Sequence, residues 1–356
     1  MVQHPLLFRI VKVIPETEHA STFALEETSG AHIPYKAGQF LTLIFESHGK
    51  ELRRSYSLSS SPSIDEDLCI TVKRVHNGAI SRNLLDHYRE WDLLQALAPS
   101  GMFVLEEDTE AEKTIFLLAA GSGITPVYSL LKSVLHCEGR ASVVLIYQNH
   151  TEKSTIFRNA LEQMAAEFPD RFTWIDLVST PNSPNQTSQR LNNGQLERII
   201  AERQFDSANA RFFICGPLSF MRMCQYTILP MGFKPGQVRK EYFVIDEPPP
   251  PPLVKEAKPR QVTLHTGKQK ITFITQYPKT ILQSALDQNI PLPYSCRGGK
   301  CSTCVAKCTS GKVEMSINDV LTDADLAQGL ILTCVGYAVT NIELMFGERD
   351  KDSIEP

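Results

Sequence analysis

Long apolar runs are missing from this sequence, and no stretch approaches the roughly 20 residues that a membrane-spanning helix needs. The first ten residues, MVQHPLLFRI, lack the basic segment and apolar core of a secretory signal. An excess of positive charge is missing too, because 36 basic and 40 acidic side chains leave a net charge of −4. These absences predict a protein with no membrane span and no general attraction to nucleic acid.

Cysteines are few, and their distribution says more than their number. Only nine occur in 356 residues, and an odd total without a signal peptide argues against a secreted disulfide framework. Cys69, Cys137, Cys215 and Cys224 are scattered, whereas the other five crowd into the last quarter of the chain. We therefore expect a cytoplasmic protein in which the clustered thiols hold metal.

The composition is that of a folded protein with more than one domain. It is 42% hydrophobic and 21% charged, which argues against disorder. At roughly 150 residues per domain, the length predicts two to three domains. Five consecutive prolines, Pro248 to Pro252, exclude helix or central strand and favour a stiff, extended segment. We predict a linker over residues 247–259.

Residues 1–107 show the pattern of short strands. Leu68, Ile70 and Val72 alternate with more polar residues, and residues 38–45 are rich in β-branched and aromatic side chains. One helical face, at Ile80 and Leu84, interrupts them. This pattern predicts an antiparallel β-barrel.

Residues 108–246 alternate between buried strands and amphipathic helices. The strands are expected at residues 114–120, 142–147, 172–178 and 211–215, with helices from Val127 and Ile156. This order predicts a parallel sheet covered by helices, an α/β domain.

Residues 260–356 mix strands with short helices, which predicts an α+β domain. A hairpin is expected over residues 263–274 and a helix over residues 280–289, stopped by Pro291. A capping box at Thr322 and a stop at Gly329 predict a second short helix.

Four cysteines of this last domain have the spacing of an iron–sulfur site. Cys296, Cys301, Cys304 and Cys334 read C-x4-C-x2-C-x29-C, and the first part is the plant-type ferredoxin spacing for a [2Fe–2S] cluster. Two glycines of the loop let its backbone approach the sulfurs and supply N–H donors. A structural zinc site is the alternative, but a zinc ribbon brings two C-x2-C knuckles and only one is present. Cys308 lies beyond the loop, so we predict that it packs and is not a ligand.

The stretch from Leu292 to Cys304 closely resembles plant-type ferredoxins, and the resemblance covers nearly all of residues 260–346. It implies a β-grasp ferredoxin domain with the four cysteines as cluster ligands.

Arg54-x-Tyr56-Ser57 resembles the flavin motif of the ferredoxin–NADP reductase superfamily. The resemblance implies that Arg54 pairs with the pyrophosphate of FAD, to which a guanidinium fork is well matched. It also implies that Tyr56 packs on the isoalloxazine ring and that Ser57 faces its reactive nitrogen.

A second flavin segment of that superfamily is matched by Lys73-Arg74-Val75 and by Gly78-Ala79-Ile80-Ser81. There Ser81 is expected to cap a helix whose N-terminal amides receive the pyrophosphate. On the residues alone, Gly78 and Ser81 could equally form a plain turn and N-cap.

A glycine turn joins a buried strand to a helix. Gly121, Gly123, Thr125 and Pro126 do not form the dinucleotide fingerprint, because its last glycine is replaced by Pro126. Free amides at this turn suit a pyrophosphate. The turn resembles the G-x-G-x-x-P nicotinamide motif of the same superfamily.

Two further segments resemble that superfamily. Cys215-Gly216-Pro217 resembles its C-G-P motif, which lies near the nicotinamide, although Cys215 taken alone is a buried core thiol. Glu241-Tyr242-Phe243 resembles the terminal E-x-F motif, whose acid and aromatic lie near the flavin ring. The resemblance thus gives Ser57, Cys215 and Glu241 as catalytic candidates and Gly216, Pro217 and Phe243 as cofactor-binding residues.

The nicotinamide used is NADH or NADPH, and we expect NADH. A 2′-phosphate needs basic residues after the second and third parallel strands, where this chain has Asn149-His150 and Ser179-Thr180. Arg158 and Arg190 could compensate for the missing pair.

The order of barrel, nicotinamide domain, linker and ferredoxin resembles the reductase subunits of phenylacetyl-CoA ring epoxidases. It implies that hydride from NAD(P)H reaches FAD, that electrons pass singly to the [2Fe–2S] cluster, and that a di-iron oxygenase accepts them. The alternative acceptor is another mono- or dioxygenase, a hydroxylase or an acyl desaturase. The alternative from another class is a non-catalytic zinc-binding protein. Under that interpretation the flavin and nicotinamide motifs would all have arisen by coincidence.

Overall fold

The computed structural model describes residues 5–47, 49–62, 64–105, 113–136, 141–180, 189–243, 250–252, 257–266 and 269–346. The chain divides into two compact units, one spanning residues 5–244 and the other the chain from residue 245 on. Cys137 and part of the predicted linker lie outside the described residues. Within that linker, residues 250–252 and 257–259 are described and form no helix or strand.

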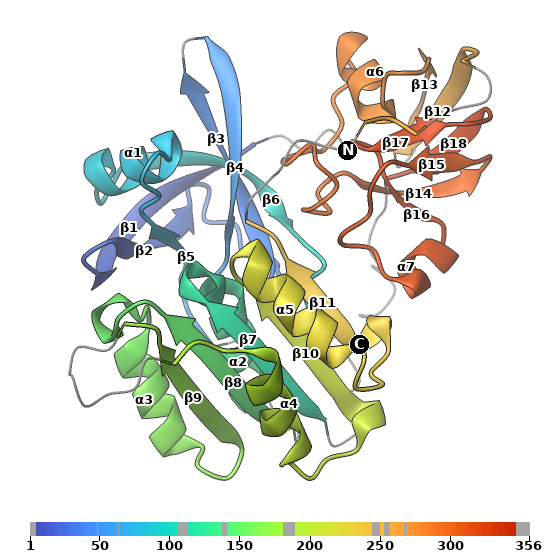
Figure 1. Cartoon of the computed structure of the whole chain (residues 1–356). Helices are drawn as coiled ribbons and strands as arrows, with labels where there is room; N and C mark the ends of the chain where they lie inside the picture. The colour runs from blue at the N-terminus through green and yellow to red at the C-terminus, as the bar shows by residue number, and fades with distance from the viewer. Residues whose placement is uncertain are drawn as a thin grey trace, which may run out of the picture. The chain divides into compact units, whose positions relative to one another are not determined.

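The first half of the larger unit is a barrel of antiparallel strands, as the sequence predicts (Figure 1). Its sheet runs in the order β4-β3-β6-β1-β2-β5, and a bridge between Leu58 and Ile70 brings the two edge strands together. Alternating apolar residues such as Phe8, Ile10 and Leu43 fill the interior. The elements are β1 (Leu6–Thr17), β2 (Ala20–Glu27), β3 (Phe40–Ser47), β4 (Lys50–Ser57), β5 (Leu68–Lys73), α1 (Ala79–His87) and β6 (Leu93–Ser100).

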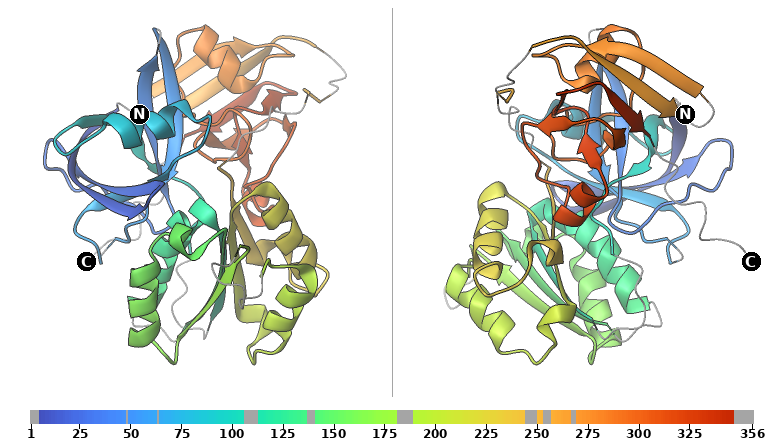
Figure 2. Two further views of the ribbon diagram at one scale, coloured as in Figure 1. Left: turned by 60° about the vertical axis from the view of Figure 1, so that its left-hand side comes forward. Right: turned by 90° about the vertical axis from the view of Figure 1, so that its right-hand side faces the viewer.

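The second half is a parallel sheet in the order β11-β10-β7-β8-β9, also as predicted. Figure 2 shows the sheet between its helices, with α2 and α3 packed on one face and α4 and α5 on the other. The elements are β7 (Thr114–Ala120), α2 (Ile124–His136), β8 (Ser142–Asn149), α3 (Arg158–Glu167), β9 (Phe172–Val178), α4 (Asn193–Ala201), β10 (Ala210–Cys215), α5 (Leu218–Ile228) and β11 (Val238–Glu241). Short 3-10 turns are η1 (Gly121–Gly123), η2 (Glu152–Ser154), η3 (Ser207–Asn209) and η4 (Pro235–Gln237).

Parallel pairing has a direct consequence for function. The carboxyl ends of parallel strands lie at one edge of the sheet, where ligands of such folds bind. Here β7, β10 and β11 are neighbours. Gly121 after β7, Gly216 after β10 and Glu241 at the end of β11 therefore meet at the same edge.

The smaller unit is the predicted α+β domain. Its main sheet has the order β13-β12-β18-β14-β16, with β12 and β18 parallel. A two-stranded sheet of β15 and β17 lies apart from it. The elements are β12 (Arg260–Thr266), β13 (Gln269–Thr275), α6 (Ile281–Asp287), β14 (Val305–Ser310), β15 (Val313–Met315), α7 (Asp323–Ala327), β16 (Leu330–Leu332), β17 (Gly336–Ala338) and β18 (Ile342–Met345).

The two helices of the smaller unit begin close to where the sequence predicts, but α6 ends earlier. Helix α6 ends at Asp287, earlier than the Pro291 stop predicts, because Asn289 takes a left-handed conformation with φ of 56°. Helix α7 begins with the predicted capping box, in which Thr322 accepts from the amide of Asp325, and Gly329 follows at φ of 81°.

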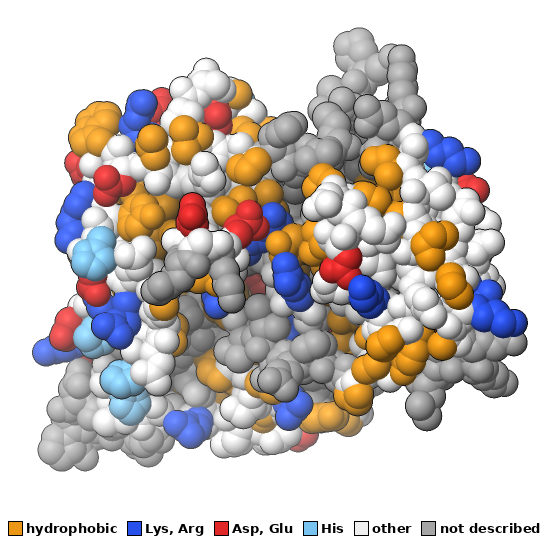
Figure 3. Space-filling model, turned by 90° about the horizontal axis from the view of Figure 1, so that it is seen from above, with side chains coloured by type: hydrophobic (Ala, Val, Ile, Leu, Met, Phe, Trp, Pro, Cys, Tyr) orange, Lys and Arg blue, Asp and Glu red, His pale blue; other side chains and the backbone are white. Residues whose placement is uncertain are grey.

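None of the described helices has the length and apolar character needed to cross a bilayer. On the face drawn in Figure 3, basic and acidic side chains of the described residues are interspersed. That distribution agrees with the nearly balanced charge of the sequence.

Candidate flavin, nicotinamide and iron–sulfur sites

The end of β4 presents the three residues of the first flavin motif. Ser57 is buried, Tyr56 packs partly into the barrel core, and Arg54 is exposed. Burial raises the pKa of the Tyr56 hydroxyl above its ordinary value. The Arg54 guanidinium donates to the carbonyl of Arg53 at 2.7 Å. An exposed guanidinium beside a half-buried aromatic ring suits a ligand with a phosphate and a flat ring.

The start of helix α1 differs from the prediction. Gly78, and not Ser81, is the N-cap, and it provides no side-chain cap. Ser81 lies one turn further on, where its hydroxyl accepts from the amide of Val75 at 3.1 Å and donates to the carbonyl of Gly78 at 3.3 Å. The prediction that Ser81 caps this helix is therefore wrong. The helix begins at Ala79, which places Ser81 inside its first turn. Position 78 is closely packed, since a Cβ there would meet the Ser81 oxygen at 2.6 Å and Val75 Cβ at 2.8 Å.

Lys73, at the end of β5, points from the flavin segment towards the glycine turn. A Cβ built on Gly121 would lie 3.4 Å from the Lys73 ammonium nitrogen. The side chain is half-buried, and burial lowers the pKa of its ammonium. A partly desolvated cation is stabilised by an anion, so this position favours a phosphate between the two segments.

The glycine turn itself is η1, between β7 and α2. Gly121 has φ of 56°, which glycine adopts without strain. Thr125 donates to the carbonyl of Ser122 at 3.1 Å, and Pro126 falls in the first turn of α2, where a missing N–H costs nothing. The amide of Ile124 donates to the carbonyls of Gly121 and Ser122. Backbone amides in the first turn of a helix lack an intrahelical acceptor, so this turn suits an anion.

One contact of this turn was not predicted from the sequence. Tyr147, fully buried on β8, donates its hydroxyl to the carbonyl of Gly121 at 3.0 Å. Burial raises the pKa of the hydroxyl, so it stays protonated. The available signal was a tyrosine inside an apolar parallel strand, whose hydroxyl needs a partner.

The second nicotinamide motif packs directly on the first. A Cβ on Gly123 would lie 2.1 Å from the carbonyl oxygen of Cys215, and one on Gly216 would lie 3.0 Å from Ala120 Cβ. Pro217 is the N-cap of α5. The two glycines thus let the turns after β7 and β10 approach each other.

Cys215 belongs to the core of the sheet. It has no exposed surface, and burial raises the pKa of its thiol well above the ordinary value, with Glu241 adding to the rise. A protonated, inaccessible thiol is a poor nucleophile. The structure thus favours packing as its role, the interpretation that the residue taken alone suggests.

Glu241 meets Ser57 across the two halves of the unit. The Ser57 hydroxyl donates to Glu241 Oε2 at 2.8 Å, and both side chains are buried. Burial raises the pKa of Glu241 to about 8, although the hydrogen bond from Ser57 opposes the rise. At neutral pH this carboxyl group is therefore protonated. Phe243, by contrast, is exposed.

The region after β8 and β9 bears on the choice of nicotinamide. Arg158 forms ion pairs with Asp176 at 2.8 Å and Glu162 at 3.1 Å. His150 Nδ1 lies 3.3 Å from the hydroxyls of both Ser179 and Thr180. The positive charge of Arg158 is thus already compensated, whereas Arg190 is exposed.

The four predicted cluster ligands converge in the smaller unit. None of them is in a disulfide; Cys304 and Cys334 are buried, and Cys296 and Cys301 are half-buried. Thiol–thiol hydrogen bonds connect the set, and the one from Cys301 lowers the pKa of Cys296 while it raises that of Cys301. Four adjacent free thiols are the donor set that a [2Fe–2S] cluster requires.

The loop around these thiols also fits a sulfur cluster. The amide of Gly298 donates to Cys296 Sγ at 3.3 Å, and the amide of Cys296 donates to Cys301 Sγ at 3.4 Å. Arg297 and Gly299 have positive φ, which folds the loop tightly. Backbone donors aimed at sulfur stabilise the added electron of a reduced cluster.

The described residues hold no group of three or more His, Cys, Asp or Glu side chains arranged for one metal ion. Cys308 is separate from the set, with its thiol directed at the carbonyl of Ser310 at 3.3 Å.

Comparison with known proteins agrees with this geometry. Residues 8–105 match an oxidoreductase FAD-binding domain, residues 117–226 an oxidoreductase NAD-binding domain, and residues 265–339 a 2Fe-2S iron-sulfur cluster binding domain. The ferredoxin reductase component of 3-ketosteroid-9-alpha-monooxygenase from Mycobacterium tuberculosis is 35% identical, over 93% of this chain and 92% of that protein. One of the subunits of 1,2-phenylacetyl-CoA epoxidase from Escherichia coli is 30% identical, over 93% of this chain and 94% of that protein.

Among solved structures, phthalate dioxygenase reductase matches with a TM-score of 0.59 at 24% identity, over 96% of this chain and 97% of that one. An intact type IV self-sufficient cytochrome P450 monooxygenase matches with a TM-score of 0.71 at 20% identity, over 96% of this chain and 40% of that one. These likenesses show the fold.

The protein is thus an oxidoreductase that uses FAD, a nicotinamide nucleotide and a [2Fe–2S] cluster. More particularly, the chain belongs to the family of electron-transfer reductase components in which these three domains are joined in one polypeptide.

Proposed function

We propose that this reductase takes hydride from NAD(P)H, passes the electrons through FAD to the [2Fe–2S] cluster, and delivers them to an oxygenase. The observation that carries the proposal is the hydrogen bond between Ser57 and Glu241, because it joins the flavin motif of the barrel to the edge of the nicotinamide domain. A nicotinamide supplies two electrons as hydride, a cluster accepts one, and a flavin exchanges electrons with both.

The flavin is proposed to lie along β4 and the start of α1. Arg54 and the first amides of α1 would hold the pyrophosphate, and Tyr56 would pack against the ring. Ser57 and Glu241 would face the reacting edge, as a hydroxyl donor and a buried acid. Cofactor-binding roles are proposed for Arg54, Tyr56, Ser57, Lys73, Gly78, Ser81, Gly121, Gly123, Thr125, Pro126, Gly216, Pro217 and Phe243.

The nicotinamide nucleotide is proposed to bind over η1, with its pyrophosphate between the turn amides and Lys73. We propose NADH as the preferred donor, because the charge of Arg158 is compensated by Asp176 and Glu162. The comparison of kcat/KM for NADH and NADPH tests this preference, and a higher value with NADPH would contradict it.

Cys296, Cys301, Cys304 and Cys334 are proposed as the cluster ligands. The proposed domains are residues 1–107 for FAD, 108–246 for the nicotinamide nucleotide and 260–356 for the cluster, with a linker over 247–259. A cytoplasmic location is proposed from the free cysteines.

The oxygenase partner is proposed to be the di-iron component of a phenylacetyl-CoA epoxidase. The Escherichia coli relative, which belongs to such an epoxidase, supports this. The alternative is another oxygenase, since relatives also include the reductases of a ketosteroid monooxygenase and, at 31% identity in Pseudomonas aeruginosa, of glycine betaine monooxygenase. A hydroxylase or an acyl desaturase remains a further alternative.

Reconstitution distinguishes these acceptors. The purified reductase and NADH would be mixed separately with a phenylacetyl-CoA epoxidase oxygenase and with a ketosteroid oxygenase, each with its substrate. Product formed at least tenfold faster with the epoxidase supports the proposed partner. A faster ketosteroid reaction would overturn the partner while leaving the electron-transfer function intact.

A further inference from the structure

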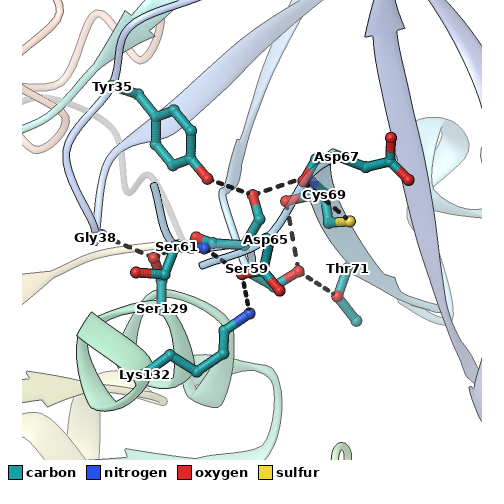
Figure 4. A network of polar contacts seen from close by, with 11 residues as sticks. Tyr35, Gly38, Ser59, Ser61, Asp65, Asp67, Cys69, Thr71, Ser129 and Lys132 are labelled. Carbon is teal, nitrogen blue, oxygen red and sulfur yellow. Dashed lines mark hydrogen bonds and ion pairs between the residues drawn. The ribbon is translucent and has the colours of Figure 1, made fainter. Parts of the chain in front are cut away.

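The middle of helix α2 contacts the flavin barrel. These contacts lie several residues beyond the nicotinamide turn that precedes the helix. Two side chains on α2, Ser129 and Lys132, reach loops of the barrel (Figure 4). Both are buried, with 0% and 8% of their surface exposed. Neither belongs to the flavin or nicotinamide motifs.

Ser129 makes the first connection. Its hydroxyl donates to the backbone carbonyl of Ser60 and accepts from the amide of Gly38 at 3.3 Å. Gly38 has φ of 86°, and a Cβ there would lie 1.9 Å from the carbonyl oxygen of Phe103. The same Cβ would lie 3.1 Å from Leu130 Cδ2 on α2, so the backbone at Gly38 is closely packed against both Phe103 and the helix.

Lys132 makes the second connection, an ion pair with Asp65. The same carboxylate accepts from the amide of Ser61 at 2.6 Å, and the ammonium lies 4.6 Å from the centre of the Tyr128 ring. A cation with so little exposed surface is costly without its counter-charge. Separating helix α2 from the loop that carries Asp65 would break this ion pair, so the pair keeps helix and loop in contact.

The barrel side of these contacts is itself tied to the β-sheet. The side chain of Ser60 accepts from the Tyr35 hydroxyl at 2.8 Å and from the amide of Cys69, on β5, at 2.9 Å. Ser59 bonds Thr71 of the same strand at 2.8 Å. Figure 4 shows these contacts as one continuous network beside the helix. The loop that receives α2, residues 59–65 without the undescribed residue 63, is the anchor of the helix, and these hydrogen bonds tie it to β5.

Helix geometry connects this anchor to the chemistry. At about 1.5 Å per residue, Lys132 lies about 12 Å along the helix axis from Ile124, where α2 begins. A helix behaves as a rod over this length, so its orientation at Ser129 and Lys132 sets the position of η1 relative to Tyr56 and Ser57. Hydride transfer is sensitive to such placement, because a misplacement of about 1 Å can cost about 100-fold in rate.

We propose that Ser129 and Lys132 are positioning residues for hydride transfer, which hold the nicotinamide turn in register with the flavin site. This inference rests on the proposed function of η1. A positioning role predicts that loss of these side chains lowers the rate of hydride transfer and leaves the binding of FAD and NADH unchanged.

The test is rapid-mixing reduction of the full-length, flavin-loaded protein by NADH under nitrogen. In Lys132→Met we expect the limiting rate of flavin reduction to fall about tenfold or more. The NADH concentration at half-maximal rate and the flavin content should change less than twofold. The long-wavelength absorbance of the stacked nicotinamide–flavin pair should weaken, and Lys132→Arg should restore most of the rate.

Coupling within the pair is tested with Asp65→Asn. If the ion pair is the positioning contact, the double variant Asp65→Asn, Lys132→Met should be no slower than the slower single variant. Lys279→Met is the matched control, since it removes an ion pair with Asp287 in the ferredoxin domain at 2.7 Å. Its flavin reduction should equal that of the wild type.

The proposal is overturned if Lys132→Met and Ser129→Ala both reduce flavin within twofold of the wild-type rate. If Lys132→Met does not fold with flavin bound, Ser129→Ala alone decides by the same criterion. A wild-type flavin that NADH fails to reduce would instead contradict the proposed function, whatever the variants do.

Discussion

The hydroxyl of Ser57 donates to the carboxyl of Glu241 at 2.8 Å, although 184 positions separate the two residues in the chain. Ser57 ends a strand of the barrel, and Glu241 ends the edge strand of the parallel sheet. A buried hydrogen bond thus joins two halves with different folds. The proposed site of hydride transfer lies there.

The first prediction concerns the pH dependence of flavin reduction. Because burial raises the pKa of Glu241 to about 8, the carboxyl is neutral at pH 7 and ionises as the pH rises. A negative charge there would oppose the arrival of electrons at the ring. The limiting rate of reduction by NADH should therefore fall about tenfold from pH 7 to pH 9.

In Glu241→Gln, which stays neutral and keeps an acceptor for Ser57, that fall should disappear. Rapid-mixing kinetics across the pH range measures both proteins. If the rate fell equally with pH in the wild type and in Glu241→Gln, the pH dependence would belong to another group.

The second prediction concerns Lys73. Its half-buried ammonium beside Gly121 has the position of a phosphate partner. Lys73→Met should raise the KM for NADH about tenfold or more, since a charge-assisted hydrogen bond contributes about 1.5–3 kcal/mol. Steady-state kinetics with cytochrome c as acceptor measures this. Lys12→Met, at an exposed lysine of β1, is the control and should leave KM unchanged. An unaltered KM in Lys73→Met would remove Lys73 from the site.

The third prediction concerns the contact between the two nicotinamide turns. A Cβ on Gly123 would lie 2.1 Å from the carbonyl oxygen of Cys215, so Gly123→Ala must push the turns apart. We expect NADH binding to weaken at least tenfold and Tm to fall by several degrees. Gly236→Ala, where a Cβ would meet nothing within 4 Å, should change neither quantity. Titration calorimetry measures the affinity for NADH, and thermal unfolding measures Tm. If Gly123→Ala and Gly236→Ala gave the same affinity and Tm, the close approach of the turns after β7 and β10 would be refuted.

The fourth prediction separates the cluster from the flavin. Cys304→Ser removes one buried thiol of the set, so it should abolish cytochrome c reduction and lower the iron content. Flavin reduction by NADH should continue at the wild-type rate. Cys308→Ser, whose thiol is directed at Ser310, should keep both activities. Full cytochrome c turnover by Cys304→Ser would exclude Cys304 as a ligand.

Much of the fold follows from local patterns. The buried strand predicted over residues 114–120 forms with those limits, because a strand covered on both faces is a continuous apolar run. Helix ends depend on single conformations that the pattern does not specify. Asn289 ends α6 early by adopting positive φ, and Gly78, not Ser81, is the N-cap of α1.

The candidate residues could be found by resemblance, but their relationships could not. A glutamate in E-x-F gives no sign that it is buried against Ser57 or that its pKa is raised. Arg158 looks available for a phosphate until the structure pairs it with Asp176 and Glu162. The contacts of Ser129 and Lys132 join segments more than 60 residues apart, and no periodicity encodes such pairs.

The most direct measurement is an anaerobic titration of the purified protein with NADH, followed by visible absorbance and by electron paramagnetic resonance. Flavin and cluster together take three electrons, so bleaching should be complete at about 1.5 NADH per chain, with about one spin from the reduced cluster. A preparation without iron or without flavin would contradict the proposed electron path. So would a flavin that bleaches while the cluster stays oxidised.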